Sequence, residues 1–431
     1  MAELTTGLLT GLRRPLERAA VISMHTSPTA SLGHSANGGL NVYVREVCSA
    51  LSDRGVATDV FTRRLNPDDP AIERIAPLSR VIYVPAGSTD LDKYGLFDHV
   101  PEFTDGVARF TAEEGLRYDL LYSHYWLSGA VACALHPLFA VPWVHTAHTL
   151  AVVKNRRLAR GAVPEPQVRL QLEGEISRCA DLLVVSTLSE AEDLVAAYGI
   201  PRDKTEVIAP GVDLDMFRPR EAESSRRLIG YPDHRIVLFV GRLERLKGVD
   251  IVLEAFAAEV EGRPDLRLLV LGEDSRHSGE SEKARLKDLA QKLGIEARVD
   301  FVGPVAHHEL PYFYSAATAC LMPSYSESFG LVALEAQACG CPVIASNVAG
   351  LASVVRDGVS GFLVDGDEPD RYAQALGRLL DDRALAAEMG RKGILLAQRF
   401  TWQRTADRLL AAFARLGAGA QVGVQASART E

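Results

Sequence analysis

The sequence has no cluster of Lys and Arg, no long apolar run and few cysteines. Its formal net charge is −9, whereas a nucleic-acid-binding surface needs clustered cations to contact phosphates. No run approaches the roughly 20 apolar residues of a membrane-spanning helix. The opening MAELTTGLLTGLRRPLERAA also lacks the uninterrupted apolar core and cleavage site of a secretory signal. We therefore expect a cytoplasmic protein with no nucleic-acid contact and no integral membrane contact.

Signals for a metal site are equally sparse. The six cysteines lie mostly in apolar helical or strand contexts, as in reduced cytosolic proteins, and Cys339 and Cys341 are too close together to form a metal site alone. The His-x-x-His spacing of His145 and His148 falls at a strand end and loop without an accompanying carboxylate. Some sugar transferases hold a divalent metal with a D-x-D pair, but the three pairs here lie in turn-rich loops where Asp is expected anyway. We predict no metal and no other cofactor; the three pairs are Asp90-Asp92, Asp213-Asp215 and Asp365-Asp367.

Length and hydrophobic pattern predict two α/β domains. A chain of 431 residues, 47% of them hydrophobic, is too long for one core. Short β-branched runs alternate with helical stretches in two series, and strands that are apolar on both faces indicate parallel sheets covered by helices on both sides. A polar stretch at 213–232 separates the series. We predict two Rossmann-like doubly wound parallel-sheet domains, with a flexible N-terminus at 1–19, domains at 20–215 and 216–395, a C-terminal helix at 396–415 that crosses back, and a flexible tail at 416–431.

Two carboxylates flank a Phe-Gly corner in the second domain. Glu327 precedes the corner, and Glu335 lies in the short helix that Gly340 ends. In an open α/β sheet such a strand-to-helix corner lies where ligands bind, and the free N–H groups of the first helical turn favour an anion. Hydroxyl groups on either side of that anion would suit the two acids, which is the outline of a nucleotide-diphosphate sugar. The alternative is that the acids only complement the helix dipole or are solvated.

Two cations follow another strand of the same domain. Arg242 and Lys247 lie in the loop of FVGRLERLKG, again at the carboxyl edge of the sheet. Cations there would neutralise a diphosphate leaving group as its charge develops. An ordinary solvated loop would also contain such residues.

The first domain offers paired glycines and a group of polar side chains. Gly38 and Gly39 lead into a helix and would let a phosphate or sugar approach the backbone. They do not form the G-x-G-x-x-G pattern, which disfavours a dehydrogenase. Imidazoles and hydroxyls at the ends of two further strands suit a polyol or a phosphorylated acceptor, although His124 and His145 fit a structural role better. These residues are His124, Tyr125, His145, Thr146, His148 and Thr149.

Taken together, these motifs resemble family 4 of the retaining glycosyltransferases, which have the two-domain GT-B fold. The resemblance rests on ESFGLVALE, GRLERLKG and APGVD and covers residues 20–412. Within that family, ISMHTSP, GGLNVY, SHYWLSG and HTAHTLAVVKN are similar to the inositol 3-phosphate N-acetylglucosaminyltransferases of mycothiol synthesis. The resemblance implies an acceptor-binding first domain, a nucleotide-sugar-binding second domain, a cleft between them and a homodimer. It also implies UDP-GlcNAc as donor and 1D-myo-inositol 3-phosphate as acceptor.

The resemblance assigns roles to individual residues. Arg242 and Lys247 would grip the donor diphosphate, Glu335 the ribose and Glu327 the hydroxyls of the transferred sugar, with His148 beside that sugar. Backbone groups of the donor site would come from Gly38, Gly39, Phe329, Gly330, Leu331 and Val332. The acceptor phosphate would be held by Lys93, Tyr125, Thr149 and Arg169, and Asn41 would contact the inositol ring. The predicted reaction is transfer with retention, in which a leaving-group phosphate oxygen takes the acceptor proton.

Departures from the family pattern keep other substrates open. Ala36 and Asn37 replace the usual Asp-Ser or Asp-Ala, Leu40 replaces Met, and GEDSRHSG at 272–279 replaces a GGPSG loop. An antibiotic-pathway paralogue of lincosamide type would use another donor, such as a GDP-sugar, and a small thiol- or carboxylate-bearing acceptor. A sucrose- or sucrose-phosphate-synthase-like transferase is a further alternative. A phosphorylase is disfavoured because no pyridoxal-phosphate lysine context is present, and a non-catalytic nucleotide-sugar sensor remains possible on fold grounds.

Overall fold

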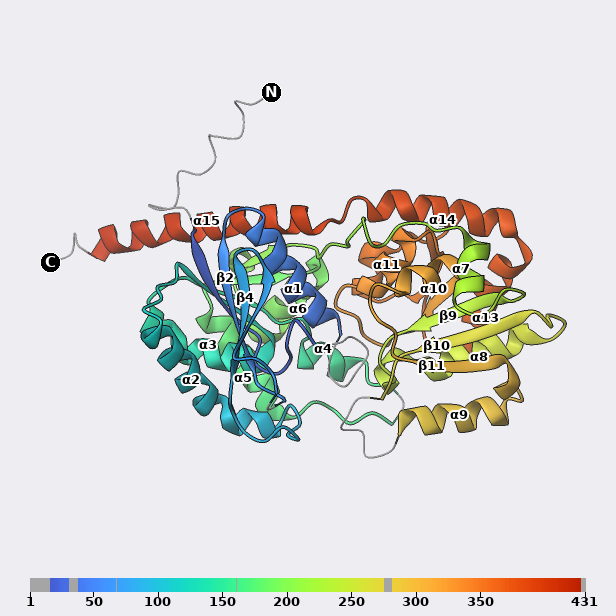
Figure 1. Ribbon diagram of the computed structural model, residues 1–431, viewed down its shortest axis with the longest axis horizontal. Coiled ribbons are helices and arrows are strands. Elements are labelled where there is room, and N and C mark those ends of the chain that lie inside the picture. The colour runs from blue at the N-terminus through green and yellow to red at the C-terminus, as the bar shows by residue number, and fades with distance from the viewer. Residues whose placement is uncertain (1–15, 31–37, 67, 160, 275–280, 428–431) are drawn as a thin grey trace, which may run out of the picture.

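The computed structural model describes residues 16–30, 38–66, 68–159, 161–274 and 281–427. It consists of two lobes side by side, each built on its own sheet (Figure 1). This confirms the predicted fold of two doubly wound parallel-sheet α/β domains.

The first domain contains an eight-stranded sheet in the order β3-β4-β2-β1-β5-β6-β7-β8. Alternate residues of the central strand β1 enter two different cores: Ala20 and Ile22 pack on one face, and Ala19 and Val21 on the other. This is the two-fold periodicity of a strand buried on both sides. The strands are β1 (Arg18–Ile22), β2 (Ala57–Arg63), β3 (Ile72–Ala76), β4 (Ser79–Val84), β5 (Leu120–His124), β6 (Trp143–Thr146), β7 (Leu182–Val185) and β8 (Thr205–Val207). The helices are α1 (Gly39–Ser52), α2 (Val100–Glu113), α3 (Tyr125–Phe139), α4 (Ala151–Arg156), α5 (Gln167–Cys179) and α6 (Leu188–Tyr198), with 3-10 turns η1 (Gly95–His99) and η2 (Arg202–Lys204).

One strand of this sheet departs from the prediction. β3, which is not among the apolar runs recognised in the sequence, pairs antiparallel with β4 at the edge of the otherwise parallel sheet. All its side chains are exposed or only partly buried. An edge strand that is partly open to solvent carries too few apolar residues to be recognised as a buried run.

The second domain contains a six-stranded parallel sheet in the order β11-β10-β9-β12-β13-β14. Its central strand β9 alternates between two cores in the same way as β1, with Val237 and Phe239 on one face and Ile236 and Leu238 on the other. The strands are β9 (Arg235–Val240), β10 (Leu266–Leu271), β11 (Val299–Gly303), β12 (Ala317–Met322), β13 (Val343–Ser346) and β14 (Gly361–Val364). The helices are α7 (Ala222–Leu228), α8 (Val249–Val260), α9 (Glu282–Lys292), α10 (Leu310–Ala316), α11 (Leu331–Ala338), α12 (Ala349–Val354), α13 (Pro369–Asp381) and α14 (Arg383–Ala397), with 3-10 turns η3 (Arg245–Lys247) and η4 (Glu296–Arg298).

Strand order locates the functional region in both domains. In the first sheet the direction of winding reverses between β1 and β5, and in the second sheet it reverses between β9 and β12. Ligands of doubly wound sheets bind beyond the carboxyl ends of the strands at such a switch point. The loops that follow these four strands are therefore the candidate site.

The C-terminal helix joins the two domains. The chain leaves α14, forms a bridge between Thr401 and Val212, and continues as α15 (Trp402–Ser427) along the first domain (Figure 1). Trp402, Leu409 and Phe413 are buried in the first domain's core. The helix extends to Ser427, into the stretch for which we predicted a flexible tail. Residues 1–15 and 428–431, the ends of the two predicted flexible segments, lie outside the described residues.

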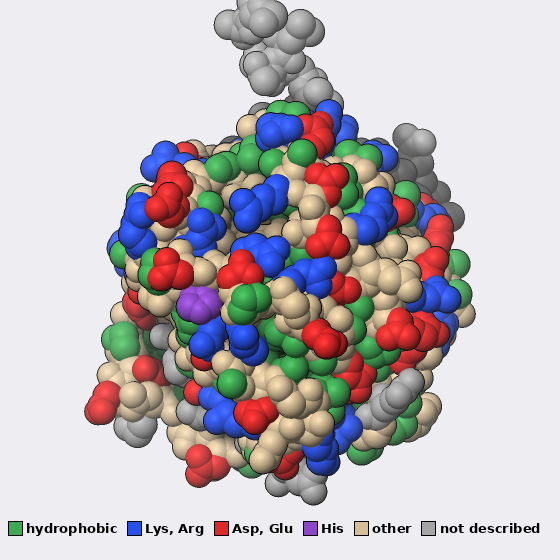
Figure 2. Space-filling model, turned by 90° about the vertical axis from the view of Figure 1, so that its right-hand side faces the viewer, with side chains coloured by type: hydrophobic (Ala, Val, Ile, Leu, Met, Phe, Trp, Pro, Cys, Tyr) green, Lys and Arg blue, Asp and Glu red, His purple; other side chains and the backbone are tan. Residues whose placement is uncertain are grey.

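The surface carries charges of both signs. Over the end of the second domain, acidic and basic side chains are interspersed (Figure 2). Within the described ranges, no helix combines the length and apolar character needed to cross a membrane.

Candidate active site between the two domains

Two loops of the second domain are fastened to each other at the switch point. The backbone N–H of Tyr325, after β12, donates to the carbonyl of Leu246, after β9, at 2.9 Å. Gly248 has a φ of +64°, and a Cβ there would lie 2.3 Å from the Pro323 carbonyl oxygen. Only glycine permits this conformation and this close approach without strain. The loop that contains the predicted cations is therefore held against the loop that contains Glu327.

This contact brings three predicted donor-site residues to one edge of the sheet. The Lys247 Nζ lies 2.6 Å from a Glu327 carboxylate oxygen, and both side chains are about one-fifth exposed. Arg242, in the same loop, pairs with Glu244 at 2.7 Å. Two partly exposed cations and one carboxylate thus line the same edge. Such a group can neutralise a diphosphate and accept hydrogen bonds from sugar hydroxyls.

The first turn of α11 supplies backbone donors beside these side chains. Gly330, its N-cap, has a φ of +100°, and a Cβ there would lie 2.8 Å from the Leu351 side chain. Phe329 is buried and packs edge-on against Phe400, which fixes the loop as it enters the helix. The N–H groups at the start of a helix have no i−4 acceptor and form an anion-binding surface. Of the predicted amides, those of Leu331 and Val332 lie in this turn, and those of Phe329 and the N-cap Gly330 directly precede it.

The side chain of Glu335 is almost fully buried. It is 6% exposed, and it accepts a hydrogen bond from the Tyr314 hydroxyl at 3.1 Å and contacts His307 Nε2 at 3.0 Å. His307 also approaches Arg45 of the first domain at 3.4 Å. A carboxylate has about four acceptor positions, so Glu335 retains capacity for ribose hydroxyls beside a narrow interdomain hollow that it lines with His307 and Trp402.

In the first domain, the four predicted phosphate ligands form one cluster. Arg169, fully buried in α5, donates to Thr149 Oγ1 at 3.0 Å, and its guanidinium lies over the Tyr125 ring at 5.0 Å. Burial opposes ionisation of Lys93, but the fields of Tyr125 and Glu165 outweigh it and raise the pKa of the lysine. Lys93 and Arg169 contact the same carboxylate, that of Glu165, at 3.1 and 2.8 Å. Residues separated by up to 76 positions in the chain thus meet at one point.

Three further side chains in this cluster escaped the prediction. Glu165 contacts Lys93, Arg169 and also Lys154, the last at 3.3 Å, and the Tyr94 hydroxyl donates to it. The cations lower the pKa of Glu165 although burial opposes this. Burial and the field of Arg169 lower the pKa of Lys154 to about 8. Lys154 lies within the HTAHTLAVVKN segment, but nothing in the sequence indicates that Tyr94 and Glu165 meet it.

His148 lies beside this cluster in a strained conformation. Its φ is +59° and that of Tyr125 is +76°, a region that non-glycine residues seldom occupy and that is enriched at functional sites. His148 Nε2 lies 3.0 Å from His124 Nδ1, and the Tyr43 ring packs edge-on against it at 5.0 Å. Burial, together with the fields of His145 and His25, lowers the pKa of His148 to about 3. The imidazole is therefore neutral at physiological pH.

His25 is a site residue that sequence reasoning missed. It follows β1 at the switch point, and its ring lies 4.4 Å from that of Tyr125. Its Nδ1 is buried without a hydrogen-bond partner. Burial and the fields of Lys93, Arg169 and Arg242, from both domains, lower its pKa to about 3. Its place directly after a strand at a switch point was the available signal.

The start of α1 is organised by Asn41. The Gly38 N–H donates to Asn41 Oδ1 at 3.0 Å, while the amide nitrogen of Asn41 donates to Thr26 and to the Ser27 carbonyl. Asn41 is buried. In the described part of the chain, its side-chain amide binds the loop after β1 and the start of α1. Ala36 and Asn37, and residues 275–280 of the loop that begins at Gly272, lie outside the described residues.

The two halves of the site touch. The Ser328 hydroxyl donates to the His148 backbone carbonyl. A Cβ at Gly39 would lie 3.3 Å from Leu331, and one at Gly38 would lie 3.9 Å from Arg242. The paired glycines therefore admit the second domain at close range, next to the predicted diphosphate cation.

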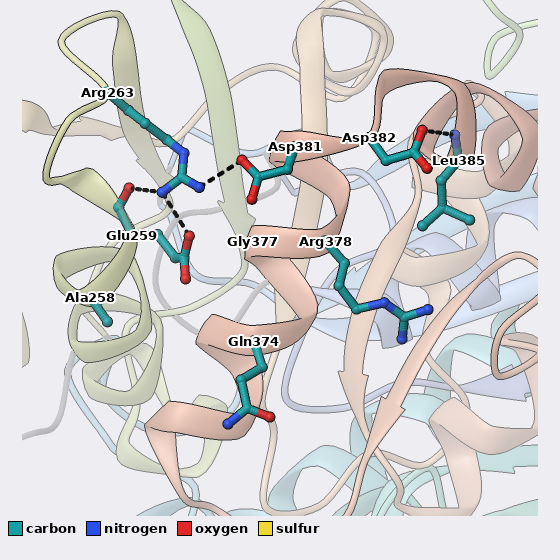
Figure 3. A pocket seen from close by; sticks show the side chains of 9 residues that line it. All are labelled: Ala258, Glu259, Arg263, Gln374, Gly377, Arg378, Asp381, Asp382 and Leu385. Carbon is teal, nitrogen blue, oxygen red and sulfur yellow. Dashed lines mark hydrogen bonds and ion pairs between the residues drawn. The ribbon is translucent and has the colours of Figure 1, made fainter.

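Other hollows and polar clusters in the described part of the chain lack the character of a second active site. A broad open hollow on the outer side of the second domain is lined by Arg263, which pairs with Glu259 at 2.8 Å and with Asp381 at 2.7 Å (Figure 3). Asp92 and Asp213 accept backbone N–H bonds from their own turns, as the structural interpretation of the D-x-D pairs predicts. Among the described residues, no three His, Cys, Asp or Glu side chains converge as a metal site would require.

Comparison with known proteins agrees with this division of the chain. The family profile "Glycosyl transferases group 1" matches residues 221–396, and the profile "Glycosyl transferase 4-like domain" matches residues 38–211. The D-inositol 3-phosphate glycosyltransferase of Acidothermus cellulolyticus is 46% identical, with 92% of this chain and 90% of the relative covered. That of Corynebacterium jeikeium is 45% identical, with 91% and 95% covered.

Solved structures show the same architecture. Sucrose-phosphate synthase from Thermosynechococcus elongatus superposes with a TM-score of 0.86 at 36% identity and covers 94% of this chain and all of that one. WaaG, a glycosyltransferase involved in lipopolysaccharide biosynthesis, shares the fold with a TM-score of 0.70 at 20% identity and covers 92% of this chain and 99% of that one. These likenesses confirm the predicted GT-B fold.

Proposed function

The chain belongs to the two-domain GT-B glycosyltransferases, in the group whose members include the D-inositol 3-phosphate glycosyltransferases, and on that premise we propose its reaction. It transfers N-acetylglucosamine from UDP-GlcNAc to 1D-myo-inositol 3-phosphate with retention of anomeric configuration. The observation that carries the proposal is the convergence of Lys93, Tyr125, Thr149 and Arg169 in one cluster of the first domain.

The cluster has the chemistry of a site for a phosphorylated acceptor. A buried guanidinium, a lysine and a threonine hydroxyl offer charged and neutral donors to phosphate oxygens. Arg169 is held from behind by Glu173, whose carboxylate oxygen accepts from its Nε at 2.7 Å. Its remaining donors thus point away from Glu173, toward Thr149 and Glu165.

On the donor side, Arg242 and Lys247 would neutralise the diphosphate as the bond to the sugar breaks. Glu327 would accept sugar hydroxyls while its pair with Lys247 holds it in place. Glu335, fixed by His307 and Tyr314, would accept the ribose hydroxyls.

The chemical step needs no protein nucleophile. The acceptor hydroxyl oxygen bonds to the anomeric carbon on the face from which the diphosphate departs. The bond from that carbon to the diphosphate oxygen breaks, and the hydroxyl proton passes to an oxygen of the leaving phosphate. Neutral His148, beside the transferred sugar, contributes a hydrogen-bonding group without adding positive charge.

Product analysis tests the proposal. Purified protein incubated with UDP-GlcNAc and 1D-myo-inositol 3-phosphate should release UDP and an N-acetylglucosaminyl-inositol phosphate whose anomeric proton coupling is that of the α-configuration of the donor. UDP release without such a product, or an inverted product, would contradict it.

Two other acceptors of the same kind can be tested in parallel. The likeness to sucrose-phosphate synthase makes a transfer of sucrose-phosphate-synthase type, to a phosphorylated sugar, the second candidate. The Glu165 carboxylate already lies among the cations, which favours a carboxylate-bearing acceptor as the third, with a GDP-sugar as donor. Turnover with either of these alternative acceptors, and none with the inositol phosphate, would replace the proposed substrates.

A further inference from the structure

One carboxylate occupies the place where an acceptor anion would bind. Its two oxygens contact four donors: Glu165 Oε1 contacts Lys93 and Lys154, and Oε2 contacts Arg169, Tyr94 and, at 3.3 Å, Lys93 as well. Two of these four donors, Lys93 and Arg169, are proposed ligands of the acceptor's phosphate. A phosphate oxygen bound to both would need the position that the carboxylate now fills.

The surrounding charges show that the carboxylate alone does not satisfy the cluster. Three cations meet one carboxylate there; Arg169 also pairs with Glu173, and Lys154 also lies in the field of Glu244. Arg169 is fully buried, and its Nη1, though 2.8 Å from Glu165, makes no hydrogen bond of good geometry. Buried guanidinium donors are normally hydrogen-bonded, so this atom is better suited to a ligand than to its present partner.

The backbone of Glu165 is held separately from its carboxylate, which the four donors hold. Asn155 clamps both backbone groups: its amide donates to the Glu165 carbonyl at 3.1 Å and its oxygen accepts from the Glu165 N–H at 2.7 Å. Rotation of the side chain about its own bonds would therefore vacate the position without moving the loop.

We propose that Glu165 is an internal counter-ion that fills the acceptor's anion subsite in the unliganded enzyme and is replaced there by the acceptor's anionic group. Lys154 then becomes a third cationic ligand of that group, in addition to the predicted four residues. The proposal rests on the proposed function only in requiring an anionic acceptor.

The test uses the full-length enzyme and the near-isosteric substitution Glu165→Gln. With inorganic phosphate as the probe, thermal shift should show a lower Tm for Glu165→Gln without phosphate and a larger phosphate-induced increase than in the wild type. With an anionic acceptor that turns over, the acceptor KM should fall about three- to tenfold while the donor KM is unchanged. Glu223→Gln, which breaks an exposed pair on α7, matches the charge change and should alter neither quantity.

Lys154→Met gives the complementary readout. It should raise the acceptor KM about tenfold and reduce the phosphate-induced Tm increase, with the donor KM unchanged. A higher acceptor KM and a smaller phosphate effect in Glu165→Gln would overturn the proposal, because Glu165 would then be a fixed support for the cations. If inositol 3-phosphate fails as substrate for every variant, the proposed acceptor is wrong, but the phosphate measurements still decide the role of Glu165.

Discussion

The Ser328 hydroxyl of the second domain donates a hydrogen bond to the backbone carbonyl of His148 in the first. This bond joins the loop before α11 to the loop after β6, the two segments that place Glu327 and His148. It therefore links closure of the domains to assembly of the site, which in glycosyl transfer also excludes water.

Removal of this bond should loosen closure without disturbing either domain. Ser328→Ala should lower kcat/KM for transfer about fivefold, the equivalent of ~1 kcal/mol for one hydrogen bond, and should increase the share of donor that is hydrolysed. Steady-state rates of UDP release with and without acceptor measure both effects. Ser353→Ala, which removes a bond to Gly350 within α12, is the control, and an equal effect in both variants would contradict the role of closure.

Lys247 and Arg242 should act on the transition state. Because each would stabilise the departing diphosphate, Lys247→Ala or Arg242→Ala should lower kcat by about 10²–10³-fold and leave Tm nearly unchanged. Lys292→Ala at the exposed end of α9 serves as the control. Steady-state kinetics at saturating donor decide the point, and a kcat within twofold of wild type would remove the residue from the catalytic group.

Arg169 should be irreplaceable even by lysine. A lysine cannot reach Thr149, Glu165 and Glu173 together, so Arg169→Lys should leave buried acids under-paired, cost about 3 kcal/mol or more of unfolding free energy and raise the acceptor KM at least tenfold. Denaturant unfolding and acceptor titration measure the two effects. The control Arg156→Lys, at an exposed pair with Asp193, should change neither the free energy of unfolding nor the acceptor KM. If Arg169→Lys raised the donor KM as much as the acceptor KM, the effect would not be local to the acceptor site.

The buried histidines make stability depend on pH. His25, His145 and His148 have pKa values of about 3, lowered chiefly by burial, against about 6.5 in the unfolded chain. Below pH 6.5 the unfolded state binds more protons, so stability is complete above that pH and falls on acidification toward pH 3.

Each of these histidines contributes up to about 1.4 kcal/mol per pH unit in this window. Urea unfolding at pH 7.5, 6 and 5 should therefore give a falling free energy of unfolding, with a shallower slope for His145→Gln. A slope that is the same in the variant and the wild type would contradict the buried neutral state of His145.

The sequence predicted those parts of the site that depend on local pattern. The corner between β12 and α11 and the loop after β9 were recognisable because apolar runs, glycines and charged residues occur there at fixed spacing. Which side chains from distant parts of the chain come into contact could not be predicted from the sequence pattern. His307 reaches Glu335 across 28 positions and Glu165 reaches Lys93 across 72, and these contacts depend on how the loops fold together.

Backbone conformation was also beyond prediction. The positive φ of Tyr125 and His148 is imposed by packing around non-glycine residues, so composition gives no sign of it. The edge strand β3 was missed because its partly exposed side chains form no apolar run.

Calorimetric titration tests the central claim most directly. The purified protein is titrated with UDP and with GDP, and then with 1D-myo-inositol 3-phosphate in the presence of the nucleotide that binds. The account predicts tight binding of UDP in preference to GDP, followed by saturable binding of the inositol phosphate. A preference for GDP, or no heat from the acceptor in the presence of UDP, would contradict it.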